Sequence, residues 1–343
     1  MKAFVLRDFQ QEMAIENVPD PVPGPLDIIL RVRACGVCGT DVKIVSGKIP
    51  PPIVNLPHTP GHEIAGEVVA VGSAVRDLSP GQKGVVYPYL GCGGCEMCRT
   101  ERENICLSVK RLGFELPGGF AELVRLPAYN FCSFEASLSL VEMAILPDAV
   151  ATSYHALKTL AKVRAGQEVL IMGVGGLGIH GVQIAKGMGA RVTAADRREG
   201  SLKLARGFGA DATVDVSKES LQKTVLESTG GKRFDVIIEN VGSAQSLQET
   251  LPCLKRGGRM ILVGYDPCAP YPLQTMEMHY NEWTLSGARL STKHELLEVI
   301  GLVEKRKVRP VVSRVVPWER ANQVIREIEQ ETTVGRTVLT FDG

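Results

Sequence analysis

Hydrophobic and polar residues follow two different patterns along the chain, and the pattern changes near residue 150. Before that point, short runs of apolar and β-branched residues are separated by Pro and Gly, which indicates a β-rich domain. The proline-rich segments 19–25 and 50–52 are expected to form irregular surface connections. We expect strands at 28–32, 63–71, 84–87 and 120–126.

After residue 150, short apolar runs alternate with segments of helical periodicity. This alternation predicts an α/β fold built on a doubly wound parallel sheet. The tail from about residue 287 adds an amphipathic helix at 293–305 and a strand at 337–341. The expected strands of the sheet are 168–172, 191–195, 212–215, 235–239, 259–263 and 283–286, and the expected helices are 176–186, 200–208 and 244–254.

The stretch 168–189 is almost uncharged, and its glycines would also suit helix packing in a membrane. However, His180, Gln183 and Lys186 interrupt it, and the uncharged part is short for a membrane span. Because the glycines are concentrated directly after an expected strand, we favour a βα unit of a soluble domain.

Length and charge narrow the class of protein. The 343 residues suffice for two domains, and 39 basic against 38 acidic residues argue against a nucleic-acid or membrane-surface partner. The apolar run in the first ten residues is too short for a signal peptide, and the nine cysteines are compatible with a reducing compartment. We therefore expect a cytoplasmic protein.

Four cysteines lie within fifteen residues, namely Cys92, Cys95, Cys98 and Cys106. A short loop with four thiolates can surround one tetrahedral Zn²⁺, and four sulfur ligands leave no open position for catalysis. Four unrelated buried thiols would need three evenly spaced cysteines by chance. The spacing therefore predicts a structural zinc lobe at about 91–107.

The run GVGGLG, which starts at Gly173, follows an expected strand and opens an expected helix. In this context it indicates a dinucleotide-binding turn. Gly173 permits the tight turn, Gly175 lets a pyrophosphate approach the backbone, and Gly178 allows close packing of helix on strand. The start of the helix, with Gly176 and Leu177, offers free N–H groups to phosphates.

Asp196 ends the second expected strand, 18 positions after Gly178. An acid at an offset of about 20 binds the adenosine ribose hydroxyls in dinucleotide sites, and a carboxylate there repels a 2′-phosphate. NAD is therefore favoured. Arg197 and Arg198 follow directly and could soften the repulsion, so NADP stays open, and both arginines could equally be solvated loop charges.

A second set of metal ligands must be assembled from separate segments. Cys38 lies in GVCGTD, and His62 and Glu63 lie in GHE. A catalytic zinc takes three protein ligands and one open position, and Cys, His and carboxylate ligands all suit it. Taken singly, each residue also has an ordinary explanation, as a small buried thiol, a hydrogen-bonded core histidine or a charge at a strand edge.

The run GHEIAGEVVAVGSAV, from Gly61, resembles the zinc signature of the medium-chain, zinc-dependent alcohol dehydrogenases. GVCGTD before it, the cysteine lobe and GVGGLG after it occur in that family's order, and the resemblance covers the whole chain. It implies a GroES-like catalytic domain formed by residues 1–148 and 287–343. It also implies a Rossmann domain at 149–286.

The resemblance implies ligands for the catalytic zinc. Cys38 and His62 match the family's first two ligands, and Asp148, in DAVATSYHAL, matches the position of the third. Asp148 follows Pro147 at an expected helix start, so a helix N-cap is the alternative. Glu63 resembles a residue behind the zinc, either an alternative ligand or a group that supports the ligands.

The resemblance also assigns three residues outside the ligand set. Thr40 matches the hydroxyl that hydrogen-bonds the alcohol and starts a proton relay, whereas Lys43 stands where many relatives carry the relay's histidine. A lysine is normally protonated at neutral pH, so it is a poor base unless its pKa is lowered. Arg336, in GRTVLTF, resembles an arginine that contacts the cofactor pyrophosphate.

These features predict an oxidoreductase with two zinc ions per subunit that transfers a hydride between an alcohol, or its carbonyl product, and NAD. A polyol, sugar or amino-alcohol dehydrogenase of the same family is the nearest alternative. A non-catalytic zinc- and nucleotide-binding scaffold is a more distant one. The resemblance further implies a homotetramer or homodimer that pairs through edge strands of the Rossmann sheets.

Overall fold

The computed structural model describes residues 1–135, 137–228, 231–268, 270–331 and 333–341. It divides into two compact units. The first unit comprises Met1–Asp148, Ser291–Lys305 and Pro310–Gly343, and the second comprises Ala149–Leu290 and Arg306–Arg309. The chain thus returns to the first unit at Ser291, slightly after the expected boundary at residue 287.

The first unit contains a seven-stranded sheet around the long strand β3 (Asp27–Val37). β3 pairs antiparallel with β4 (Glu63–Val71), β8 (Leu123–Pro127) and β17 (Arg336–Thr340). β17 lies near the end of the chain, so both chain ends contribute to one sheet. The other strands of this sheet are β5 (Lys83–Val86), β9 (Phe131–Ser133) and β16 (Val312–Pro317).

The expected strand at 120–126 begins only at Leu123. Phe120 instead accepts a hydrogen bond from the Phe4 amide at 2.8 Å, which ties this segment to β1 (Lys2–Val5). β1 pairs with β2 (Ala14–Asn17), a hairpin that the sequence reasoning missed. Short pairings such as these depend on the partner strand more than on local pattern.

Buried aromatic rings join the two chain ends in the core of the first unit. Trp318 packs edge-on against Phe4, with ring centroids 5.3 Å apart, and stacks on Phe341 at 5.1 Å. The smaller elements of this unit are β6 (Tyr89–Leu90), β7 (Lys110–Arg111), α1 (Gly39–Val45), α2 (Glu96–Arg99), α3 (Leu140–Ala144), α10 (Lys293–Glu304) and α11 (Ala321–Glu329).

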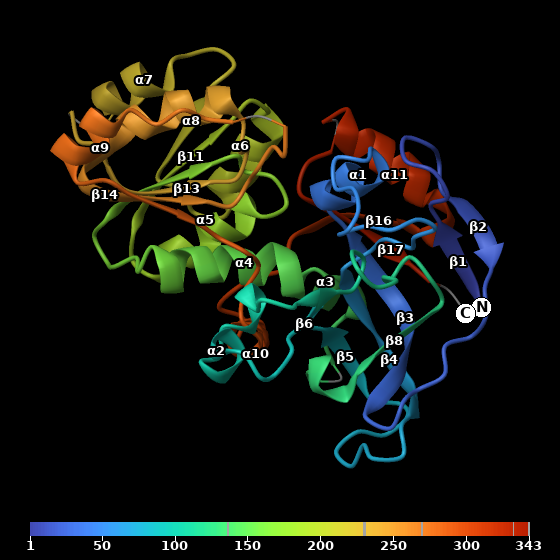
Figure 1. Ribbon diagram of the computed structural model, residues 1–343. Helices are drawn as coiled ribbons and strands as arrows, with labels where there is room; N and C mark the ends of the chain where they lie inside the picture. Colours follow the sequence, from blue (N-terminus) through green and yellow to red (C-terminus); the bar gives the residue numbers. More distant parts are fainter. Residues whose placement is uncertain (136, 229–230, 269, 332, 342–343) are drawn as a thin grey trace. The chain divides into compact units, whose positions relative to one another are not determined.

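The second unit contains a six-stranded parallel sheet in the order β12-β11-β10-β13-β14-β15. Figure 1 shows α7 (Leu221–Ser228) and α8 (Ala244–Thr250) on one face of this sheet and α5 (Gly178–Gly187) on the other. The doubly wound α/β fold is therefore confirmed. The strands are β10 (Glu168–Met172), β11 (Arg191–Asp196), β12 (Ala212–Asp215), β13 (Phe234–Glu239), β14 (Leu254–Leu262) and β15 (Thr284–Gly287), and the remaining helices are α4 (Ala151–Tyr154), α6 (Glu199–Gly207) and α9 (Thr275–Asn281).

The helix expected at 244–254 was too long. α8 ends at Thr250, a short 3₁₀ turn at Leu251–Cys253 follows, and β14 begins at Leu254. Pro252 lies in that turn, where its missing N–H cannot continue an α-helix. No helix in the described ranges is long and apolar enough to cross a membrane.

Candidate active site

Antiparallel pairing brings three distant segments to one end of the sheet in the first unit. Gly36 pairs with Glu63, and Val37 pairs with Thr337. Because neighbouring strands run in opposite directions, the residue after β3, the residue before β4 and the first residue of β17 meet at this end. These residues are Cys38, His62 and Arg336.

Cys38, His62 and Asp148 form one buried cluster at this end. Cys38 caps the start of α1, and Asp148 lies in a π-helical turn at Leu146–Val150. Cys38 Sγ lies 3.2 Å and His62 Nε2 lies 3.5 Å from the same oxygen, Oδ2 of Asp148. One ligand atom of each residue lies within 4.8 Å of the others, so the three can share one metal ion.

Asp41 holds the segments that carry two of these ligands. Its Oδ2 accepts a hydrogen bond from the Cys38 amide at 2.8 Å, and its Oδ1 accepts one from the Gly61 amide at 3.3 Å. Oδ1 also lies 3.4 Å from Nδ1 of His62, which leaves Nε2 turned towards Asp148. The sequence reasoning missed Asp41, and its only signal was its place at the end of GVCGTD.

An ion pair lies beside the cluster. Nη2 of Arg336 is 2.7 Å from Oε1 of Glu63 and 3.1 Å from Oδ2 of Asp148. Burial raises the pKa of Glu63 to about 8, although the Arg336 charge opposes this shift. Burial would lower the pKa of Arg336, but Cys38, Glu63 and Asp148 together raise it, so the guanidinium stays charged. These contacts place Arg336 beside the ligands; its expected contact with a cofactor pyrophosphate stays a prediction.

The donors of this cluster fit a catalytic zinc ion. A thiol, an imidazole and a carboxylate provide three ligands of the types that zinc prefers, with a fourth position left for substrate. The acidic groups of Asp41, Glu63 and Asp148 are all buried, and Arg336 is a neighbouring cation. Since buried charge is costly unless it is paired, a divalent cation among these groups would stabilise their ionised forms.

The four lobe cysteines also lie at metal-ligand distances. A Zn–S bond of about 2.3 Å places tetrahedral sulfur ligands about 3.8 Å apart. The Sγ atoms of Cys95 and Cys98 are 3.6 Å apart, those of Cys95 and Cys106 are 3.7 Å apart, and those of Cys92 and Cys98 are 4.0 Å apart. Backbone N–H groups of Cys98 and Leu107 lower the pKa of Cys95 to about 6, which favours a thiolate. The lobe geometry fits one tetrahedral ion.

The glycine-rich run in the second unit forms a tight turn between β10 and α5. Gly173 has φ +79°, which favours glycine. A Cβ on Gly178 would lie 2.1 Å from the Gly173 carbonyl oxygen, so only glycine permits this packing. A Cβ on Gly175 would meet no atom nearer than 3.6 Å, which leaves its backbone open to a ligand. Gly176 and Leu177 complete the turn before α5 begins at Gly178.

Asp196 lies beside this turn. Met172 pairs with Ala195 across the parallel strands, so Gly173 and Asp196 follow at adjacent strand ends. The buried carboxylate of Asp196 accepts a hydrogen bond from the Val174 amide at 2.8 Å. The sheet reverses its strand order between β10 and β13, and ligands of doubly wound sheets bind at such a point.

Comparison with known proteins assigns the family. A profile described as "Alcohol dehydrogenase GroES-like domain" matches residues 24–136, and one described as "Zinc-binding dehydrogenase" matches residues 176–305. An alcohol dehydrogenase of Geobacillus stearothermophilus is 32% identical over 340 residues, which cover 99% of this chain and 98% of that protein. The chain belongs to the medium-chain, zinc-dependent alcohol dehydrogenase family.

Two further comparisons agree with this family. An NAD-dependent alcohol dehydrogenase of Sulfolobus acidocaldarius is 33% identical over 347 residues, covering 99% of each chain. The crystal structure of the alcohol dehydrogenase from Aeropyrum pernix superposes with a TM-score of 0.94 at 34% identity, covering 99% of this chain and 100% of that chain. The likeness thus extends over both units of this dehydrogenase.

Thr40 and Lys43 lie on α1 of the dehydrogenase. Thr40 is half-buried in the first turn, and its Oγ1 lies 3.7 Å from Cys38 Sγ. Lys43 is half-buried in the last turn of the same short helix. The hydroxyl of Thr40 is therefore close to the ligand cluster, whereas the relay role of either residue stays a prediction.

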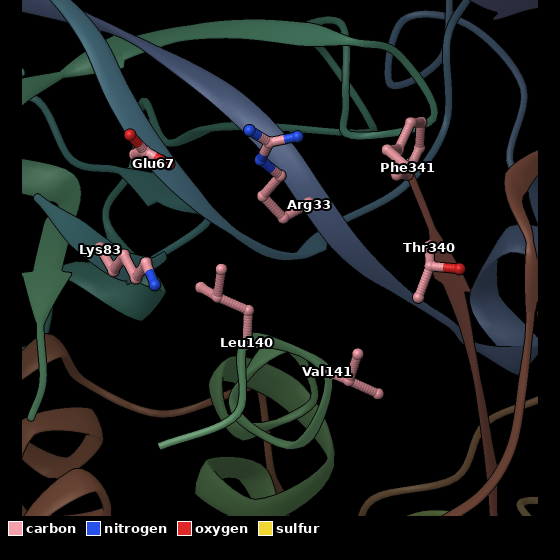
Figure 2. Close-up of a pocket in the computed structure, with 7 residues that line it drawn as sticks. All are labelled: Arg33, Glu67, Lys83, Leu140, Val141, Thr340 and Phe341. Carbon is pink, nitrogen blue, oxygen red and sulfur yellow. The ribbon is translucent and has the colours of Figure 1, made fainter. Parts of the chain in front are cut away.

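An open hollow of about 470 Å³ on the first unit lies among other residues. Figure 2 shows it between strand residues Arg33, Glu67 and Lys83 and residues Leu140 and Val141 of α3. None of the candidate zinc ligands lines it, so we assign it no part in the reaction.

Proposed function

We propose that this chain is an NAD-dependent alcohol dehydrogenase that holds two zinc ions, one catalytic and one structural. The observation that carries the proposal is the buried cluster of Cys38, His62 and Asp148. Three mixed ligands of this kind would leave the fourth position of a tetrahedral zinc ion open for substrate. The four lobe cysteines would hold the second ion and take no part in catalysis. The substrate is an alcohol or the corresponding aldehyde or ketone.

The residues around the cluster would have different roles in catalysis. Zinc, when bound, supplies a Lewis acid that makes a substrate hydroxyl acidic near neutral pH. Asp41 Oδ1 lies 3.4 Å from Nδ1 of His62 and would favour an orientation of the ring that leaves Nε2 for the metal. Thr40 Oγ1, 3.7 Å from Cys38 Sγ, would accept a hydrogen bond from the substrate hydroxyl, take its proton and pass on its own proton in the same relay. Lys43 lacks a free lone pair while protonated, so we propose that the proton leaves Thr40 through water rather than through Lys43.

The second unit would bind the dinucleotide. The turn at Gly173, Gly175 and Gly178 with the start of α5 suits the pyrophosphate, and Asp196 suits the ribose hydroxyls. NAD bound there would supply the hydride acceptor for alcohol oxidation. The carboxylate of Asp196 and the similarity to an NAD-dependent enzyme of Sulfolobus acidocaldarius favour NAD as the main cofactor.

We propose a homodimer or a tetramer of dimers that pairs through β15, the edge strand of the parallel sheet. Exposed apolar side chains of Leu273, Met276 and Tyr280 lie on the adjoining segment and helix α9, and self-association would cover them. The mass in solution, measured by light scattering, should be two or four times that of the chain. A single-chain mass would contradict this proposal.

We also propose a reducing, cytoplasmic setting. All nine cysteines, each of which the structure describes, are free thiols. Four of these thiols form the lobe, and one belongs to the proposed catalytic cluster. Metal-binding thiols of this kind stay reduced in such a compartment.

The function is tested by following NADH formation with a panel of primary and secondary alcohols, polyols, sugars and amino alcohols. The wild-type chain, Cys38→Ser and the matched control Cys268→Ser, which changes an exposed cysteine, are compared. We expect chelator-sensitive turnover in the wild type and control, and loss of turnover with loss of one zinc per chain in Cys38→Ser. Full turnover in zinc-depleted Cys38→Ser would reject the proposed site.

A further inference from the structure

The carboxylate of Asp196 is already saturated with hydrogen-bond donors. Its Oδ2 accepts from the Val174 amide at 2.8 Å and from Nη2 of Arg198 at 3.2 Å. Its Oδ1 accepts from the amide and Nε of Arg198 at 2.9 and 3.0 Å. A carboxylate has about four lone-pair sites, so these bonds occupy all of them.

Arg198 lies between Asp196 and the glycine-rich turn. Its side chain is 32% exposed, whereas that of Asp196 is only 6% exposed. Its Nη2 lies 3.6 Å from the position of a Cβ on Gly175, in the glycine-rich turn. The guanidinium therefore covers the ribose-binding carboxylate from the solvent side, next to the glycine-rich turn.

This position has opposite consequences for two cofactors. The ribose hydroxyls of NAD are hydrogen-bond donors to Asp196, so the Arg198 side chain must first release the carboxylate. A 2′-phosphate instead offers anionic oxygens, which a guanidinium binds with charge-assisted, often bidentate, hydrogen bonds. The same residue thus competes with the hydroxyls and attracts the phosphate.

We propose that Arg198 determines the choice of cofactor and lets this chain bind NADP as well as NAD despite Asp196. The proposal rests on the dinucleotide site of the proposed function. It makes Arg198 a specificity-determining residue, whereas Arg206 on the adjoining helix α6 has no such role, because its guanidinium bonds Glu199 and Thr213.

The test measures the affinity of the full chain for two cofactor fragments, 5′-AMP and 2′,5′-ADP, by calorimetric titration. We expect Arg198→Ala to weaken the binding of 2′,5′-ADP by about tenfold or more, since a charge-assisted hydrogen bond to the phosphate is lost. Binding of 5′-AMP should stay equal or tighten, because the carboxylate becomes free. Arg198→Lys keeps the charge but not the bidentate guanidinium, so its affinity for 2′,5′-ADP should lie between those of the wild type and Arg198→Ala. Arg206→Ala should have the same affinity as the wild type.

Two results would overturn the inference. Equal weakening of both fragments in Arg198→Ala would mean that Arg198 only holds Asp196 or packs on the adenine. Selective loss of 2′,5′-ADP binding in Arg197→Ala instead would place the phosphate contact one residue earlier. A wild-type chain that binds neither fragment nor NADH would reject the proposed dinucleotide site itself, and titration with NADH separates that failure from the first two.

Discussion

At the scale of single residues, a buried carboxylate that is not itself a candidate ligand organises the catalytic cluster. Asp41 is fully buried and accepts hydrogen bonds from the Cys38 and Gly61 amides while it faces Nδ1 of His62. Such supporting partners set the ring orientation and basicity of a ligating histidine. Asp41 should therefore control metal affinity without touching the metal.

We predict that Asp41→Asn lowers the zinc affinity of the cluster by about 10- to 100-fold. The amide keeps the shape and one acceptor, so the fold should persist, but its charge no longer supports His62. Competition with a chromophoric chelator measures the affinity, and Asp77→Asn, at an exposed position, is the control. Unchanged affinity in Asp41→Asn would show that the contact with His62 is dispensable.

At the scale of elements, the turn before α5 depends on the lack of a side chain at one position. A Cβ on Gly178 would lie 2.1 Å from the Gly173 carbonyl oxygen, which is backbone and cannot move aside cheaply. Gly187, the last residue of the same helix, has open space around its Cβ position. Gly178 and Gly187 therefore serve as a test position and its control in the same helix.

We predict that Gly178→Ala destabilises the chain by about 1–3 kcal/mol, the usual cost of overpacking, and weakens NADH binding. Gly187→Ala should leave NADH binding intact and raise the free energy of unfolding by up to about 0.5 kcal/mol, because alanine lowers the entropy of the unfolded chain. Chemical unfolding and NADH fluorescence measure both effects. Equal behaviour of the two variants would contradict the turn geometry.

The cysteine lobe is also linked to a helix that follows it by almost two hundred residues. Glu103, between Cys98 and Cys106, accepts a hydrogen bond from the Lys293 amide in the first turn of α10 at 2.6 Å. Glu103 is only 8% exposed, and a carboxylate at a helix N-terminus is favourable. A folded lobe thus stabilises the start of α10.

We predict that Glu103→Gln speeds hydrogen exchange of the Lys293 amide by about tenfold, the effect of losing about 1.4 kcal/mol. Removal of the lobe metal should have the same effect in the wild type, because the loop would no longer hold Glu103 in place. Glu96→Gln, on an exposed side chain of the lobe, is the control. Unaltered exchange of the Lys293 amide in both experiments would show that the lobe does not stabilise the start of α10.

At the scale of the whole molecule, the candidate metal ligands and the glycine-rich turn belong to different compact units. The cluster and the lobe lie in the unit formed by Met1–Asp148 and the later segments, and the turn lies in Ala149–Leu290. Compact units with their own cores can unfold separately. A ligand that binds one folded unit stabilises that unit by mass action.

We predict two transitions in scanning calorimetry. NADH at about one hundred times its dissociation constant should stabilise the unit that binds it by about 2.7 kcal/mol and so raise the midpoint temperature of one transition. A chelator should lower the midpoint temperature of the other transition. Catalytic-site variants such as Asp41→Asn should move only the chelator-sensitive transition. A single transition whose midpoint temperature changes with both NADH and the chelator would show that the two units unfold together.

The sequence alone determined the features that are encoded over short distances. The spacing of Cys92, Cys95, Cys98 and Cys106, the glycine-rich turn and the strands β10 and β12 all follow from local periodicity and loop chemistry. The four cysteines lie within fifteen residues, the glycines lie within one turn, and each strand is marked by its own apolar run, so pattern and structure coincide. The resemblance to a family supplied Cys38, His62 and Asp148, which no local pattern connects.

Only the tertiary structure decided which distant groups meet. Asp148 lies 110 positions from Cys38, and Arg336 lies 273 positions from Glu63, yet they are in contact. Arg336 meets Glu63 because β17 and β4 both pair with β3, and Asp148 comes from a turn outside the sheet. A local pattern does not tell which distant segments come together. The same holds for Asp41 beside His62 and for the donors that saturate Asp196, because the direction of a side chain is set by the packing around it.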